Sequence, residues 1–126
     1  MTMLAYIALG GLIGTVARYG LQGWIQARLT AAELPLGTLA VNLLGSLLLG
    51  FVMRYGTGSM VLSPEVRAGV TIGFCGAFTT MSTFAYESRA LFADGNGGQA
   101  FVYMSVTVVG CLVATIAGVA LANRLL

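Results

Sequence analysis

Apolar residues fill four long stretches of this chain, and polar residues gather in the short segments between them. The stretches cover residues 3–26, 35–55, 66–92 and 99–123. A hydrocarbon core about 30 Å thick takes about 20 helical residues to cross, so each stretch is long enough to span it once. The pattern predicts an all-α membrane protein, one domain of residues 1–126 with four transmembrane helices and both chain ends on one side.

The connections between the stretches contain the usual signals for helix ends. Pro35 stands where the first turn of a helix tolerates proline, Ser63 precedes Pro64 as an N-cap would, and the glycine-rich run that starts at Asp94 closes the third stretch. These connections leave no room for a soluble domain. We therefore expect no enzymatic activity.

Composition agrees with lipid as the solvent. Hydrophobic residues make up 58% of the 126 residues and charged residues 8%, which leaves too little polar surface for a soluble domain of this size. The sequence has no histidine, the commonest general base. Cys75 and Cys111 fit no paired metal motif, and we interpret both as small packing residues.

Small residues recur at helical spacing in all four stretches. In lipid such residues let helices approach closely, so we interpret them as packing contacts. They are Gly10 and Gly14, Ser46 and Gly50, Gly69 and Gly73, and the run Gly110, Ala114, Gly118 and Ala122.

The arginines divide almost evenly between the two sides of the predicted bundle. One side receives Arg54, Arg67 and Arg124, and the other receives Arg28 and Arg89, with Arg18 near it. Orientation follows a Lys/Arg excess in short cytoplasmic loops, and this chain has almost none. Two interpretations stay open: a single orientation set by a weak bias, or insertion both ways and assembly as an antiparallel, dual-topology homodimer. Four thin helices cannot enclose a hydrated pathway alone, which favours the dimer.

The third stretch contains the weakest helix-forming run in the chain, GFCGAFTTMSTF at residues 73–84. Glycine, β-branched and hydroxyl residues weaken a helix. At membrane depth, non-helical backbone is tolerated only where it is buried in protein or lines a cavity. We therefore predict a break between Gly73 and Thr83 that offers backbone carbonyls and amides to ions.

Two further polar features lie within the predicted spans. Asn42 stands in the middle of the second stretch, where an unpaired amide would cost several kcal/mol, so it must face another helix or a hydrated path. In the fourth stretch a mildly polar residue recurs every four positions, at Tyr103, Thr107, Cys111 and Thr115. Interhelical hydrogen bonding and a packing seam are the alternatives to an ion path, and both stay open.

Together these motifs resemble the Fluc-type fluoride channels of the CrcB family over the whole chain. The resemblance rests on GGLIGTVARY at 10–19, GTLAVN at 37–42, and GFCGAFTTMSTF at 73–84 followed by Glu87. It implies a passive fluoride channel in the inner or plasma membrane, built as a dual-topology homodimer with two antiparallel pores. The partners would be a second copy of the chain, fluoride and the bilayer, with no nucleic acid.

The resemblance also implies roles for single residues. Asn42 would donate hydrogen bonds toward fluoride, and Phe84 would present the positive edge of its ring. Where the family usually has another phenylalanine, this chain has Met81, whose thioether offers a weaker partner than a ring. The carbonyls of Gly76 and Thr79 would hold a structural sodium ion at the dimer centre.

The remaining implied residues complete the fluoride path. They are Thr80, Ser82 and Thr83 around the break and the stripe Tyr103, Thr107, Cys111 and Thr115. Arg18 would lie in a vestibule, where a cation concentrates anions; pairing with Glu87 is its alternative role.

Two other functions are compatible with four short membrane helices. A small multidrug exporter exchanges protons for a cationic substrate through a membrane-embedded carboxylate, and the first stretch contains none. A non-transporting assembly subunit would leave Asn42 and the predicted break without a purpose.

Overall fold

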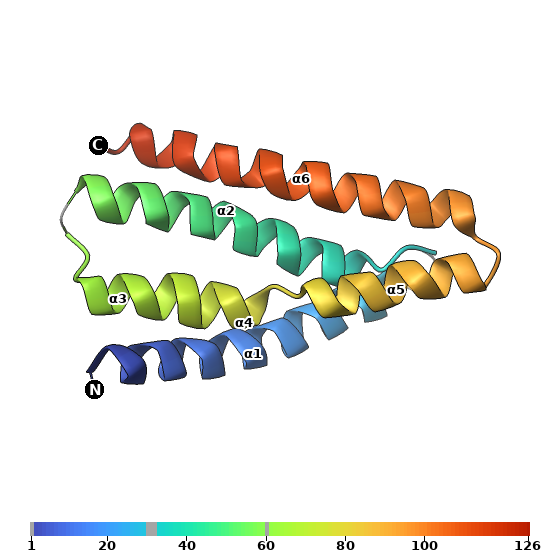
Figure 1. Ribbon diagram of the computed structural model, residues 1–126, viewed down its shortest axis with the longest axis horizontal. Helices are drawn as coiled ribbons and strands as arrows, with labels where there is room; N and C mark the ends of the chain where they lie inside the picture. The colour runs from blue at the N-terminus through green and yellow to red at the C-terminus, as the bar shows by residue number, and fades with distance from the viewer. Residues whose placement is uncertain (1, 30–32, 60) are drawn as a thin grey trace.

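Long helices that run side by side build the whole structure. The computed structural model describes residues 2–29, 33–59 and 61–126. In chain order its elements are α1 (Thr2–Arg28), α2 (Leu36–Gly58), α3 (Pro64–Ala68), η1 (Gly69–Cys75), α4 (Gly76–Phe78), α5 (Met81–Ala93) and α6 (Gly97–Asn123). Both chain ends lie at the same end of the molecule (Figure 1).

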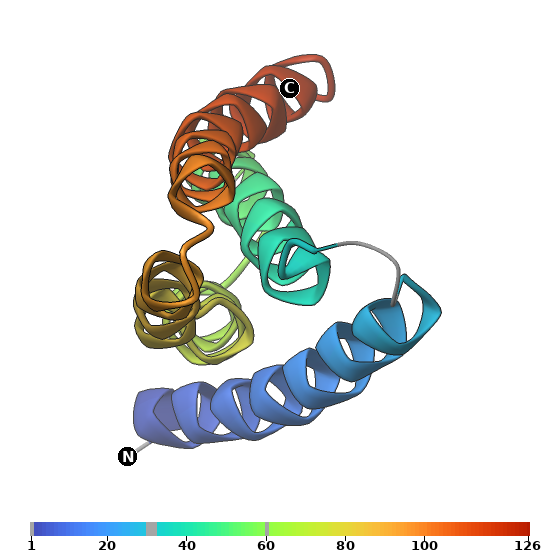
Figure 2. The same cartoon turned by 90° about the vertical axis from the view of Figure 1, so that its right-hand side faces the viewer.

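Helices α3, η1, α4 and α5 together form one crossing of the bundle, which we call the third crossing (Figure 1). The crossing and the three single helices give four helical segments long and apolar enough to span a membrane. The four membrane helices predicted from the sequence are thus confirmed. Seen from one end, α1 and α6 lie on opposite sides of the bundle, with α2 and the third crossing between them (Figure 2).

The sequence signals for helix ends work locally as expected. Ser63 accepts a hydrogen bond from the backbone N–H of Val66 at 3.3 Å and Pro64 occupies the first turn, so α3 begins with an N-cap. After α5, Gly95 adopts a positive φ of 81°, a conformation that glycine reaches without steric cost. That turn directs the chain back into α6.

The predicted break in the third crossing is present at Thr79 and Thr80. Both residues have extended backbone, with φ and ψ of −87° and 160° at Thr79 and −151° and 113° at Thr80. Just before it, η1 is a seven-residue π-helix, Gly69–Cys75, which the sequence pattern did not predict. Seven consecutive residues in this rare geometry are therefore separated from the break only by the short helix α4.

Glycines set the distance between α1 and the third crossing. A Cβ atom on Gly10 would overlap the carbonyl oxygen of Gly69, and one on Gly14 would overlap that of Phe74. No side chain separates the two backbones at these points, which confirms the predicted packing role of both glycines.

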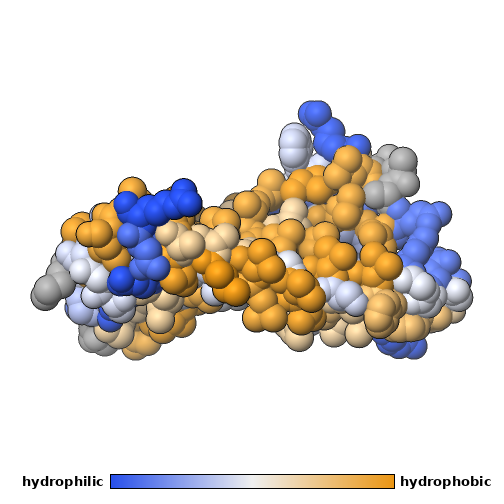
Figure 3. Space-filling model, turned by 90° about the horizontal axis from the view of Figure 1, so that it is seen from above, coloured by the Kyte–Doolittle hydropathy of each residue, from blue (hydrophilic) through white to orange (hydrophobic). Residues whose placement is uncertain are grey.

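Glycines also bring the backbones of α2 and α6 into direct contact. A Cβ on Gly50 would overlap the carbonyl oxygen of Thr115, and one on Gly118 would overlap that of Leu47. Large apolar side chains instead face outward over the middle of the molecule, while hydrophilic residues gather toward its two ends (Figure 3). This distribution suits a protein surrounded by lipid.

We predict that Gly118→Ala destabilises the bundle, because its new methyl group meets a backbone carbonyl that cannot move without shifting α2. The expected loss is about 1 to 3 kcal/mol, the usual range for overpacking. Gly20→Ala is the matched control, since nothing lies within 4 Å of its Cβ position. Thermal unfolding in detergent, followed by circular dichroism, measures both; equal losses would contradict the assigned contact.

Candidate functional site

A groove of about 440 Å³ surrounds the helix break. Residues of α2, η1, α4, α5 and α6 line it, so segments far apart in the sequence meet there. Nine of the residues predicted for the fluoride path or the sodium site are among them: Asn42, Gly76, Thr79, Thr80, Met81, Phe84, Thr107, Cys111 and Thr115. Ser82, Thr83, Tyr103 and Arg18 do not line this groove.

Asn42 is bonded to the break by both ends of its amide. Its Nδ2 donates to the carbonyl oxygen of Thr80 at 3.2 Å, and its Oδ1 accepts from the Thr80 N–H at 2.7 Å. The side chain is only 7% exposed. A primary amide has two N–H donors and Thr80 uses one, so Asn42 forms an interhelical bond and keeps a second donor at the groove.

Thr80 is also the N-cap residue of α5. Its Oγ1 accepts from the Thr83 N–H at 3.2 Å and donates to the Thr83 hydroxyl at 3.0 Å, with the Ser82 hydroxyl 3.4 Å away. This is N-cap geometry, which satisfies a backbone donor that the helix start would otherwise leave without a partner. The three hydroxyls are therefore clustered at the start of α5, and a direct role for Ser82 and Thr83 in an ion path stays a prediction.

The break leaves backbone carbonyls without their helical partners. In a continuous helix the N–H groups of Thr80 and Thr83 would bond to the carbonyls of Gly76 and Thr79. Here Asn42 and the Thr80 hydroxyl take those N–H groups instead. Nothing lies within 4 Å of a Cβ position on Gly76, so the backbone at this end of the break is open.

Phe84 and Met81, one turn apart at the start of α5, differ in environment. Phe84 is 7% exposed, and its ring centre lies 5.3 Å from that of Tyr103 with the planes inclined at 51°. Met81 is 74% exposed. The ring is therefore fixed by packing, whereas the thioether is free to move.

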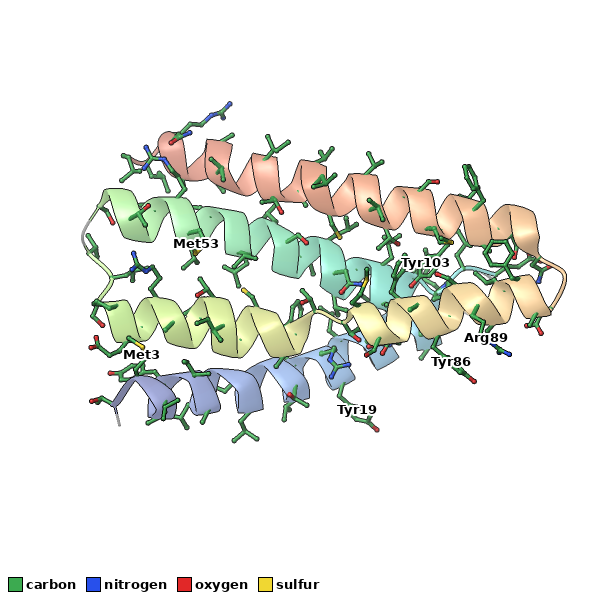
Figure 4. The ribbon with its side chains drawn as sticks, viewed as in Figure 1. Met3, Tyr19, Met53, Tyr86, Arg89 and Tyr103 are labelled. Carbon is green, nitrogen blue, oxygen red and sulfur yellow. The ribbon has the colours of Figure 1, made fainter. Side chains whose placement is uncertain are left out.

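Tyr103 belongs to a hydrogen-bond network between this groove and a second cavity. Its side chain lies between α6 and α5 (Figure 4) and its hydroxyl donates to Glu87 Oε2 at 2.7 Å. The other carboxylate oxygen of Glu87 accepts from Thr38 Oγ1 at 2.8 Å, and Gln22 donates to that hydroxyl at 3.0 Å. Phe84 lines the groove and Glu87 lines the cavity, so this network separates the two spaces.

Sequence reasoning did not assign Thr38 or Gln22 to this site, and it named Glu87 only as an alternative partner of Arg18. The sequence does contain a pattern that could have identified Thr38, because it precedes Asn42 by four residues and so lies on the same helix face. Gln22 follows Arg18 at the same spacing. Glu87 on α5 meets Thr38, which in turn accepts from Gln22. Which residues of different helices meet depends on how far the helices are shifted along their axes relative to one another, and residue spacing within one helix does not reveal that shift.

The second cavity has a volume of about 610 Å³ and Arg18 lines it, while its role as a vestibule stays a prediction. Arg18 Nε donates to the carbonyl oxygen of Ala77 at 2.9 Å. The two carboxylate oxygens of Glu87 accept from Thr38 and Tyr103, and no ion pair between Glu87 and Arg18 is present among the described residues. Glu33 and Glu87 also line the cavity, so its lining contains two acidic side chains and one arginine.

The stripe on α6 splits into residues with different bonding. Thr115 donates to the carbonyls of Cys111 at 2.9 Å and Ser46 at 3.3 Å. Thr107 is 5% exposed, and its Oγ1 has no partner among the described residues. A buried hydroxyl at the groove with no partner is available for a ligand.

Comparison with known proteins gives consistent matches. A family model described as "CrcB-like protein, Camphor Resistance (CrcB)" matches residues 5–119. A relative named fluoride-specific ion channel FluC, from Geobacter sulfurreducens, is 44% identical over 125 residues, which is 99% of this chain and 100% of the relative. Channels of the same name from Syntrophotalea carbinolica and Hahella chejuensis are 47% and 42% identical, covering 83% and 98% of this chain and 86% and 96% of their own lengths. This chain therefore belongs to the CrcB family.

Proposed function

We propose that this protein is a fluoride-specific ion channel that lets fluoride leave the cytoplasm passively and so reduces its toxicity. The observation that carries the proposal is the groove, where an amide donor, an unpartnered hydroxyl and a fixed ring meet at a broken membrane helix. Relatives named as FluC channels align with almost all of the chain. Its four apolar helices fit a multi-pass membrane protein, and its relatives are named as ion channels and not as enzymes.

Fluoride must lose water to enter such a groove, so the protein has to supply substitute hydrogen-bond donors. Asn42 offers its second N–H and Thr107 its hydroxyl. Phe84 adds the positive edge of a ring held against Tyr103. None of these groups has a full charge, so the anion is stabilised without being held too tightly to leave.

The cavity around Arg18 is the proposed entrance to this groove. An anion would pass from the cavity to Phe84 through the network of Thr38, Glu87 and Tyr103. Both oxygens of Glu87 already accept hydrogen bonds from hydroxyl donors, which stabilises the carboxylate beside an anion path. Arg18 is fixed by Ala77 next to the break, and its charge attracts anions there.

A second copy of the chain, inserted in the opposite orientation, completes the proposed channel. Met81 and Gly76 are exposed on the same groove, which leaves the path open along one side of a single chain. A partner that covers this side would enclose it. The nearly even distribution of arginines supports insertion in both orientations.

The proposal includes a structural sodium ion at the dimer centre. The carbonyls of Gly76 and Thr79 fit it, because the N–H groups that would normally bond to them are taken by Asn42 and Thr80. Oxygen atoms suit a hard cation, and the open space beside Gly76 gives access. When bound, the ion would be coordinated by these carbonyl oxygens and would hold the broken crossing of each copy to the other.

Fluoride efflux from liposomes that contain the purified protein tests the proposal. A fluoride electrode should record release well above the rate of empty vesicles, and chloride release under the same gradient should stay at the empty-vesicle rate. Absence of fluoride release from correctly folded protein would overturn the function.

Asn42→Asp should slow this efflux by about a hundredfold, roughly 2.7 kcal/mol in the barrier. The carboxylate loses both amide donors, places an oxygen against the Thr80 carbonyl and repels the anion. Asn123→Asp is the matched control: Asn123 lies at the end of α6, away from the groove, and its oxygen accepts from Arg54, as a carboxylate also would. Equal rates for the two variants would remove Asn42 from the path.

Substitutions at Met81 and Phe84 should differ in how strongly they slow fluoride flux. Met81→Phe should stay within about tenfold of wild-type flux, roughly 1.4 kcal/mol, because the family that the chain resembles usually has a phenylalanine at this position. Phe84→Ile should cost more, because it keeps apolar bulk but removes the ring edge. Flux per dimer, with dimer recovery measured on the same samples, separates a role in the path from a role in packing.

A reporter fused to the C-terminus tests the dual topology and should appear on both sides of the membrane. Asn96→Arg adds a positive charge to the connection opposite the chain ends, so this variant should place the reporter mostly outside the cytoplasm. Thr57→Arg adds the charge at the other end and should have the reverse effect. A wild-type signal confined to one side would contradict dual insertion.

A further inference from the structure

Three sulfur-containing side chains line the groove at the break. Cys75 is the last residue of η1, Met81 the first of α5, and Cys111 lies within α6. Neither cysteine is in a disulfide. Both therefore keep a free thiol at one shared space, although the sequence had suggested packing roles for them.

The three sulfur atoms differ in access. Cys75 is 2% exposed, Cys111 is half-buried and Met81 is largely exposed. Cys111 and Met81 are therefore the first sulfur atoms that an incoming solute would meet, and Cys75 lies deeper in the groove wall. Thr107, with its unpartnered hydroxyl, lines the same space, which independently indicates that the groove receives a ligand.

Thiolates and thioethers are soft ligands that select soft metal ions such as Cu(I) over hard ones. The groove lining contains no carboxylate among the described residues, so a hard divalent cation would find few suitable ligands there. The flexible Met81 side chain can adjust to an ion that the two cysteines hold.

We propose that this groove is a binding site for a soft, thiophilic monovalent metal ion of the Cu(I) or Ag(I) type, with Cys111 and Cys75 as ligands and Met81 as a third. Each thiol that binds releases its proton to the buffer, and no electron is transferred. Where the proposed fluoride path holds, the bound ion occupies the groove that Asn42 and Thr107 also line and blocks conduction. The binding itself does not depend on that function.

Silver(I) is the probe, added to purified protein in a chloride-free nitrate buffer, with equilibrium dialysis as the first measurement. Wild-type protein should bind silver tightly, and Cys111→Ser and Cys75→Ala should each weaken binding by about tenfold or more, since each removes a soft ligand. Met104→Leu is the matched control, because Met104 lies on α6 but outside the groove lining. Binding that both cysteine variants leave unchanged would overturn the site.

Fluoride efflux with and without silver is the second measurement, each variant being compared with its own silver-free rate. Silver should slow wild type and Met104→Leu by about tenfold or more, and a thiol chelator should restore the rate. The double variant Cys75→Ala with Cys111→Ser should lose this sensitivity; equal inhibition in it would overturn the block. Silver binding without fluoride efflux in any sample would confirm the metal site while refuting the proposed channel.

Discussion

The structure depends on one constraint: every polar backbone group at membrane depth needs a partner within the protein. At Thr79 and Thr80 the third crossing loses helical geometry and releases N–H and C=O groups that a helix would satisfy. Asn42 binds both backbone groups of Thr80, Arg18 binds the carbonyl of Ala77, and the Thr80 hydroxyl caps α5. Because Asn42 and Arg18 come from α2 and α1, the break can exist only where these helices lie against it.

Packing and polar chemistry share the same helix faces, and this explains how the partners reach the break. On α1, Gly10, Gly14 and Arg18 follow one another at intervals of four residues, so the contacts that bring the backbone of α1 against η1 also aim Arg18 at Ala77. On the other side of the bundle, Gly50 meets the backbone of Thr115. That close approach lets the Thr115 hydroxyl reach the carbonyl of Ser46 and places the α6 stripe beside the groove.

Sequence reasoning succeeded where one helix contains the whole signal. Span length gave the four membrane helices, helix-weakening residues gave the break, and Asn42 stood out because an amide needs a partner in lipid. It failed where the answer depends on contacts between helices. The π-helix η1 lies where Gly10 and Gly14 bring the backbone of α1 into direct contact with it. The partners of Arg18 and Glu87 depend on how far three helices are shifted along their axes relative to one another. Residue spacing within a single helix holds no information on these shifts between helices.

In the proposed channel, the broken helix explains how a groove without charged side chains serves ions of both signs. The end of α4 leaves carbonyl oxygens without helical N–H partners, and a helix end of this kind has partial negative charge. The start of α5 has the opposite polarity, and Asn42, Thr80 and Thr107 add neutral donors around it. One interruption therefore creates an acceptor side suited to a cation and a donor side suited to an anion. Neutral donors can replace the water that an anion loses, yet they bind the anion weakly enough to release it again. Conduction requires this release, whereas tight binding would prevent it.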